Sequence, residues 1–188
     1  LPISGGIGSG KSVVSRLLRI MGYSVYDTDS EAKRLMESSL EVVQKLSECF
    51  GRDIYHNGRL NRGLLSSRVF GESDKIVLLN SIVHPVVRFD FYRWSESLNE
   101  EICFVESAIL YESRFDELVD EVWTVTAPEE LRIGRVRQRS GLTEEEIKKR
   151  MAAQLSEEEK QRRAAHIIWN DGNVSVIHRV LSLLKSLE

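Results

Sequence analysis

The residues best suited to chemistry stand at the start of the chain, where Gly5 to Ser12 read Gly-Gly-Ile-Gly-Ser-Gly-Lys-Ser. This run matches the pattern G-x-x-x-x-G-K-[ST] without a mismatch. Its glycines can adopt positive φ and leave room for a phosphate against bare backbone N–H groups. Lys11 can reach the β- and γ-phosphates of a nucleotide, and the Ser12 hydroxyl is placed to bind Mg²⁺. We call Gly5 to Ser12 the phosphate loop, and it predicts a site for a nucleoside triphosphate with Mg²⁺.

The residues on either side of the phosphate loop predict the elements that position it. Leu1 and Ile3 form a short apolar strand before it, and apolar residues recur at helical spacing after it. This strand, loop and helix order argues against the alternative of a flexible glycine turn that happens to contain Lys-Ser. Pro2 suits only the first residue of a strand, so the leading strand looks clipped and we expect native residues before Leu1.

Acidic residues follow the second predicted strand. Tyr23 to Tyr26 reads as a strand that ends at Asp27-Thr28-Asp29, and Ser30 to Met36 continues as a helix. Ligands of open parallel α/β sheets bind beyond the carboxyl ends of the strands, which would place Asp27 and Asp29 beside the phosphate loop. The alternative for Asp29 is an N-cap of the helix, and Asp27 could equally be a capping or turn residue.

Another carboxylate, Glu106, follows the predicted strand Glu101 to Val105. An acid at this place in phosphate-loop enzymes often orients Mg²⁺ or its waters. An ordinary solvated glutamate is the competing interpretation.

A basic segment follows Pro128, which suits the first turn of a helix. Ser140-Gly141 ends that helix, and Thr143 to Glu146 reads as a capping box that opens the next one. The segment is either a solvated basic face or a hinged lid whose cations close over transferring phosphates. Arg135 and Arg139, four residues apart, share one face of the helix, with Arg137 between them. The helix carries Arg132, Arg135, Arg137 and Arg139.

The other elements complete an α/β pattern. Leu40 to about Ser97 is helical without a convincing strand and is broken by the polar run Gly51 to Gly58. Glu121 to Thr126 and His166 to Trp169 read as the fourth and fifth strands. A second capping box at Ser156 to Glu159 precedes the last strand, and an amphipathic helix ends the chain. Five strands with helical crossovers predict a parallel sheet of the doubly wound class.

Composition sets limits on the class of protein. The 188 residues are 41% hydrophobic and 29% charged, which suits one globular domain or a core with a helical insertion. The formal net charge of -3 argues against a general binder of nucleic acid or membrane surfaces. Cys49 and Cys103 lie far apart without metal-type spacing, and Cys103 is expected to be a buried thiol. We find no signal peptide and no bilayer-spanning run, so the cytoplasm is the expected location.

Several motifs in order resemble those of the dephospho-CoA kinases along nearly the whole chain. The phosphate loop resembles the first motif, although Val13 stands where the family usually has threonine. Val25 to Asp29 resembles the second strand and its acidic turn. The most specific matches are Leu60-Asn61-Arg62, which resembles an L-[DN]-R motif, and Leu79 to Pro85, which resembles L-N-x-x-x-H-P. Gln138-Arg139 and Gln154 resemble the lid region.

The resemblance implies transfer of the ATP γ-phosphoryl group to the ribose 3′-hydroxyl of dephospho-CoA, with roles for particular residues. Asp29, Lys11 and Arg139 would be catalytic. Asp29, Arg62, His84 and Glu106 would bind the acceptor, and Ser12 and Glu106 would hold Mg²⁺, Glu106 through water. Glu106 is one methylene longer than the aspartate often found in the family. The implied ATP-binding residues are Gly6, Gly8, Ser9, Gly10, Lys11, Ser12, Val13, Arg135, Arg139 and Asn170.

The resemblance also implies an α/β three-layer kinase fold with a five-stranded parallel sheet. One domain, residues 1–188, would contain a helical acceptor-binding region at about 30–98 and a small lid at about 137–155. The partners would be ATP and dephospho-CoA, with Mg²⁺ as cofactor, no nucleic acid, no membrane, and a monomer or small homo-oligomer. Three alternatives remain: a kinase with another acceptor, a nucleotide-dependent switch, although no N-K-x-D motif is present, and a nucleic-acid-stimulated ATPase.

Overall fold

A computed structural model describes residues 1–187 and divides the chain into two compact units. Unit 1 contains Leu1–Tyr26 and the chain from Glu100 onward, and unit 2 contains Asp27–Asn99. Within residues 1–187, no helix combines the length and the apolar character needed to cross a membrane.

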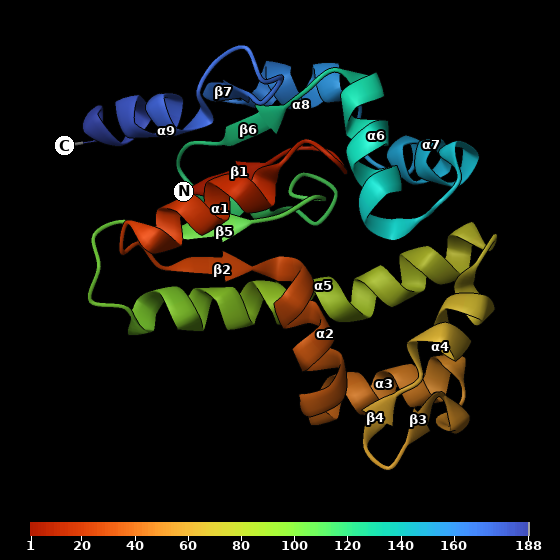
Figure 1. Ribbon diagram of the computed structural model, residues 1–188. Coiled ribbons are helices and arrows are strands. Elements are labelled where there is room, and N and C mark those ends of the chain that lie inside the picture. The colour runs from red at the N-terminus through yellow and green to blue at the C-terminus, as the bar shows by residue number, and fades with distance from the viewer. Residues whose placement is uncertain (188) are drawn as a thin grey trace. The chain divides into compact units, whose positions relative to one another are not determined.

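Unit 1 is built on a five-stranded sheet in the order β2-β5-β1-β6-β7, with β1 in the middle (Figure 1). β1 pairs in parallel with β5 on one side, Pro2 beside Val105, and with β6 on the other, Ile3 beside Trp123. This order confirms the predicted α/β fold with a parallel sheet. The strands are β1 (Pro2–Ser4), β2 (Val25–Asp27), β5 (Phe104–Glu106), β6 (Trp123–Thr126) and β7 (His166–Trp169).

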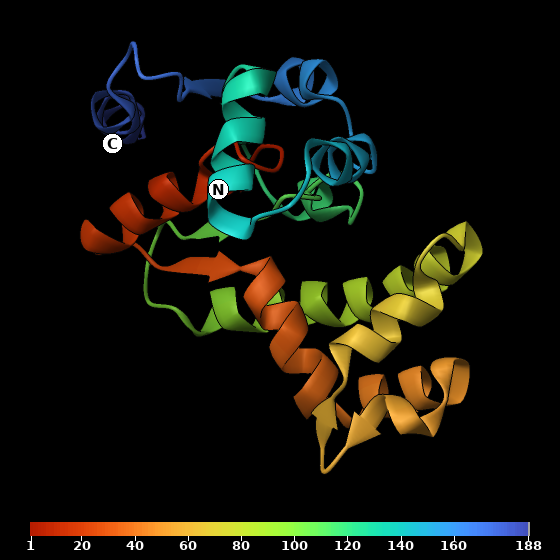
Figure 2. The ribbon, with the colours of Figure 1, turned by 45° about the vertical axis from the view of Figure 1, so that its right-hand side comes forward.

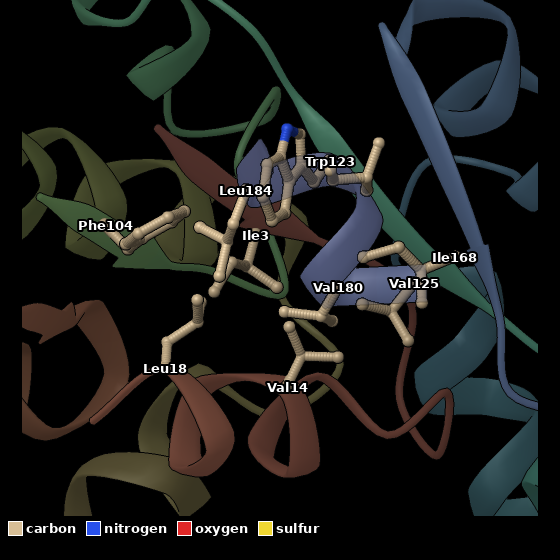
Figure 3. Packing of buried hydrophobic residues seen from close by; sticks show 10 residues of the cluster. Ile3, Val14, Leu18, Phe104, Trp123, Val125, Ile168, Val180 and Leu184 are labelled. Atoms are coloured by element: carbon tan, nitrogen blue, oxygen red, sulfur yellow. The ribbon is translucent and has the colours of Figure 1, made fainter. Parts of the chain in front are cut away.

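The core of unit 1 lies between the sheet and two helices, α1 (Lys11–Ile20) and α9 (Val176–Lys185). Figure 3 shows Val14 and Leu18 of α1 pointing at Ile3 of the central strand. Phe104 and Trp123 flank that strand with their ring centroids 5.4 Å apart, which adds aromatic contact to the buried area. Because β1 and α1 are both anchored in this core, the phosphate loop between them is held at both ends.

The remaining helices of unit 1 begin and end at recognisable signals. Gly141 adopts φ 67° and ends α6, as predicted. The capping box at Thr143 and Glu146 has both of its hydrogen bonds. Only half of the second predicted capping box is present, because Ser156 caps α8 but Glu159 does not bond back to it. Glu159 instead accepts hydrogen bonds from Arg162 and Arg163, and these lower the pKa of Glu159 to about 2. The remaining helices of unit 1 are η2 (Phe115–Leu118), α6 (Glu129–Ser140), α7 (Glu144–Ala152) and α8 (Glu157–Arg163).

Unit 2 is helical, and Figure 2 shows a small hairpin at one end of it. The hairpin corrects the prediction of a strand-free region. Its turn is Asn57-Gly58, both at positive φ, and Asn-Gly is the usual sequence for a two-residue hairpin turn. The elements of unit 2 are α2 (Thr28–Ser38), α3 (Leu40–Phe50), η1 (Arg52–Ile54), β3 (Tyr55–His56), β4 (Arg59–Leu60), α4 (Arg62–Val69) and α5 (Ser73–Ser97).

Some predicted boundaries are displaced by two or three residues. β5 begins at Phe104 rather than Glu101, and α2 begins at Thr28 rather than Ser30. Cys103 is half-buried rather than buried, and both cysteines are free thiols.

Candidate nucleotide site

The phosphate loop leaves β1 and enters α1 at Lys11. Gly8 and Gly10 have φ of 80° and 99°, a region that only glycine enters freely. Gly10 is the N-cap of α1 without a side-chain hydrogen bond, and no acidic residue occupies the first turn. The first N–H groups of α1 therefore meet neither a capping side chain nor an acid of their own turn, which is the arrangement that binds anions at helix N-termini.

The Lys11 side chain lies over the loop that precedes it. Its Nζ donates hydrogen bonds to the carbonyl oxygens of Gly5, at 2.7 Å, and Gly6, at 3.3 Å. Ser12 and Val13 are exposed in the first turn of α1, while Ser9 is fully buried. The ammonium and the Ser12 hydroxyl are thus the polar side-chain groups that the loop itself supplies to a phosphate.

Each glycine of the phosphate loop also faces a neighbour that leaves no room for a side chain. A Cβ at Gly5 would overlap the carbonyl oxygen of Val125, and one at Gly10 would overlap the Asn170 amide. Gly6 has no positive φ, so the expectation that backbone freedom explains it is wrong. Its requirement is space, because a Cβ there would overlap the Arg132 guanidinium and the Glu157 carboxylate.

Two of the predicted ATP-binding residues meet at the loop. Arg135 of α6 donates from Nη2 to the carbonyl oxygen of Asn170, at 2.8 Å. Asn170, directly after β7, donates from Nδ2 to the carbonyl oxygen of Ser9, at 2.9 Å. Arg135 Nη1 lies 3.5 Å from the same Ser9 oxygen. The structure therefore brings Arg135 and Asn170 together against the phosphate loop, whereas Arg139, one turn further along α6, is exposed.

Arg132 is the residue at this site that sequence reasoning missed. It was one of four arginines in a helix, but it is only 3% exposed. Its Nε donates to the carbonyl oxygen of Ile7 at 3.0 Å, and its Nη1 lies 3.3 Å from Glu157 Oε1. The available signal was its spacing of four from Val136, the other buried residue of α6, which places both on the inner face.

The oxygen groups of unit 1 suit a magnesium ion bound with a nucleotide. Glu106 ends β5 and pairs with Ile3, two residues before the phosphate loop. In residues 1–187, no three His, Cys, Asp or Glu residues form a ready metal cage. Mg²⁺ commonly keeps several waters and takes one or two protein oxygens together with substrate phosphates, so Ser12 and Glu106 fit that donor set.

Three of the four predicted acceptor residues, Asp29, Arg62 and His84, lie in unit 2, whereas Glu106 lies in unit 1. Asp27 is the N-cap of α2 and accepts hydrogen bonds from the N–H groups of Asp29 and Ser30, so Asp29 is not the cap. Arg62 pairs with Glu37 at 3.3 Å, eight residues beyond Asp29 on α2 and thus about 12 Å along the helix. His84 is half-buried inside α5. The Arg62 side chain therefore contacts α2 about two helical turns beyond Asp29.

Comparison with known proteins extends this description. The dephospho-CoA kinase family model matches residues 1–175. A dephospho-CoA kinase of Porphyromonas gingivalis is 39% identical over 186 residues, 98% of this chain and 92% of the relative. A dephospho-CoA kinase of Bacteroides fragilis is 40% identical over 186 residues, which are 98% of this chain and 91% of the relative. A crystal structure from Thermus thermophilus has a TM-score of 0.86 at 35% identity and covers 99% of this chain and 95% of its own. The phosphate loop leads into a helix without a capping side chain, as a nucleotide site requires, and the matches extend over nearly the whole chain. The chain therefore belongs to the dephospho-CoA kinase family.

Proposed function

We propose that this chain transfers the γ-phosphoryl group of ATP to the ribose 3′-hydroxyl of dephospho-CoA, giving coenzyme A and ADP as the last step of coenzyme A biosynthesis. The observation that supports this most is the phosphate loop, with its uncapped helix and Lys11, in a chain of this family. The reaction draws on cellular ATP, and we propose the cytoplasm as its location.

The phosphate loop would bind the donor. Lys11 would exchange its hydrogen bonds to the Gly5 and Gly6 carbonyl oxygens for the β- and γ-phosphates. The N–H groups of the loop and of the first turn of α1 would hold the β-phosphate. Arg135 and Asn170, already on the loop, would border the nucleotide, and Arg139 would approach the transferring phosphoryl group from the exposed end of α6.

Magnesium, when bound, would neutralise charge between the β- and γ-phosphates. Ser12 would hold it directly through its hydroxyl. Glu106 would orient one of its waters, because its carboxylate carries one methylene more than an aspartate.

The acceptor would be bound by residues of unit 2. Since Asp27 supplies the cap of α2, the Asp29 carboxylate is left to accept the hydroxyl proton or to orient the hydroxyl for in-line attack. Arg62 and His84 would frame dephospho-CoA in the helical region.

ADP formation from ATP and Mg²⁺ tests the proposal, with dephospho-CoA, AMP, shikimate and water as parallel acceptors and with the product identified by mass. We expect turnover with dephospho-CoA alone and a product that has gained one phosphoryl group. A Lys11→Ala variant controls for contaminating kinases and should lose the activity. If ATP binds but dephospho-CoA is inert, the acceptor assignment is wrong.

A further inference from the structure

One residue of the phosphate loop, Ile7, is held through both of its backbone polar groups, which belong to the peptide groups on either side of its Cα. Its N–H donates to Oε1 of Gln154, just after α7, at 3.0 Å. Its carbonyl oxygen accepts from Nε of Arg132, in α6, at 3.0 Å. These contacts join residues 147 and 125 positions apart in the sequence. We call Arg132, Gln154 and Glu157 the Ile7 clamp.

Glu157 fixes the arginine of the clamp. Its Oε1 lies 3.3 Å from Arg132 Nη1, and its Oε2 accepts from Thr126 Oγ1 at 3.2 Å. The ammonium of the fully buried Lys160 is 4.0 Å from Oε1. A guanidinium has its donors in a rigid planar fork, so one end can bind Ile7 while the other is bound by Glu157. Arg132 therefore has one orientation available, and that orientation points at the loop.

The packing of α6 reinforces the clamp. The Arg132 guanidinium occupies the space that a Cβ of Gly6 would need, and the Arg132 backbone does the same at Gly8. The clamp thus touches the phosphate loop at three consecutive residues. The N–H groups that would hold the β-phosphate come directly after them.

We propose that the Ile7 clamp positions the phosphate loop for nucleotide binding. Arg132, Gln154 and Glu157 are positioning residues that fix the two peptide groups flanking Ile7, so that the N–H groups from Gly8 onward point at one anion before the nucleotide arrives. Fixed donors cost less reorganisation on binding than mobile ones, and affinity increases accordingly. The inference rests on the proposed function only in that the loop binds a nucleotide.

Substitution of each side of the clamp tests the proposal, with the dissociation constant of Mg²⁺-ADP as the measurement. Gln154→Ala removes the acceptor from the Ile7 N–H, and Arg132→Lys keeps the charge but cannot bind Ile7 and Glu157 together. We expect each change to weaken ADP binding about tenfold, near the upper end of what one hydrogen bond contributes. Arg137→Gln, on the exposed face of the same helix, is the matched control and should stay within about twofold.

A thermal midpoint for each variant separates positioning from folding. Gln154 is half-buried and borders a cavity of about 480 Å³ together with Arg132 and Glu157, so its truncation opens an existing space rather than a core. If Arg132→Lys fails to fold, Gln154→Ala still decides. Folded single variants that bind ADP within about twofold of the unmodified chain would overturn the proposal.

The double variant tests whether both residues act through Ile7. Changes that act on one shared residue are not additive, so the combined loss of ADP affinity should be well below the product of the two single losses. A combined loss equal to that product means independent actions and overturns the clamp. ADP binding needs no acceptor, so an unmodified chain that binds ADP but does not phosphorylate dephospho-CoA would contradict the proposed function and leave the clamp standing.

Discussion

Two aspartates two positions apart have different tasks at the start of α2. Asp27 accepts hydrogen bonds from the N–H groups of Asp29 and Ser30 at 3.0 and 3.2 Å. Asp29 is exposed in the first turn, where a carboxylate is compatible with the helix dipole but is not needed as a cap. The structure thus leaves the chemical interpretation of Asp29 in place and assigns the capping role to its neighbour.

Asp29→Asn should lower kcat by about 10²- to 10⁴-fold, because an amide cannot accept the hydroxyl proton. ATP affinity and the thermal midpoint should change little, since Asp29 does not cap α2. Asp27→Ala should instead lower the free energy of unfolding by about 1 kcal/mol. Steady-state kinetics and thermal unfolding of both variants check this, and near-normal turnover in Asp29→Asn would reduce Asp29 to an ordinary surface acid.

Arg139 and Arg137 give a second comparison of single residues. Both are exposed near the end of α6. Arg139 lies four residues beyond Arg135, which donates to the Asn170 carbonyl oxygen, and Asn170 in turn donates to the phosphate loop. Arg139→Ala should lower kcat about tenfold or more through lost charge stabilisation, and Arg137→Ala should have a much smaller effect. The kinetic constants of the two variants decide, and the reverse order would mean that Arg137 is the arginine that approaches the phosphates.

At the scale of elements, the short helix α8 depends on a buried cation. Lys160 is fully buried, and its Nζ lies 3.4 Å from the carbonyl oxygen of Ala108 and 4.0 Å from Glu157 Oε1. Burial lowers the pKa of the Lys160 ammonium below 10.5. Helix α8, which carries Glu157 of the Ile7 clamp, is therefore attached to the rest of unit 1 through the buried ammonium of Lys160.

The lowered pKa of Lys160 predicts that the free energy of unfolding depends on pH, and Lys160→Met should remove this contribution. Below the folded-state pKa, the folded and unfolded chains both carry the proton. Between that pKa and 10.5, the unfolded chain binds a proton that the folded chain has released, so the stability due to this group rises with pH. Urea unfolding from about pH 7 to about pH 10 should show the unmodified chain gaining stability relative to the variant. A constant difference would contradict the assigned shift.

Local signals account for the elements that the sequence predicted well. β7 spans His166–Trp169 as expected, and α6 ends at the predicted Gly141. The sequence did not lead us to predict the hairpin β3-β4, because strands of two residues have no periodicity to detect. Its Asn57-Gly58 turn was nevertheless a usable signal. Arg132 and Gln154 could not be assigned to Ile7, since that contact depends on packing between segments more than 100 positions apart.

At the scale of the whole molecule, the phosphate loop belongs entirely to unit 1, which suggests a test with tryptophan fluorescence. In a Trp94→Phe variant the remaining tryptophans, Trp123 and Trp169, lie in unit 1 and report its unfolding alone. ADP at 100 times its Kd should stabilise the folded state by about 2.7 kcal/mol and raise the midpoint by several degrees. Lys11→Ala is the control, and an unchanged midpoint at saturating ADP would contradict nucleotide binding by this loop.

The position of β1 in the sheet has a consequence for synthesis on the ribosome. Among the five strands of the sheet β1 is made first, yet its partners β5 and β6 begin at Phe104 and Trp123, after all of unit 2. The central strand must therefore wait for about 100 further residues before either of its edges is paired, and long-range pairing of this kind folds slowly. We expect a nascent chain that ends near residue 99 to leave β1 open to protease. Of the five strands of this sheet, the one that anchors the phosphate loop is thus the first to leave the ribosome, yet both of its edges stay unpaired until β5 has been made.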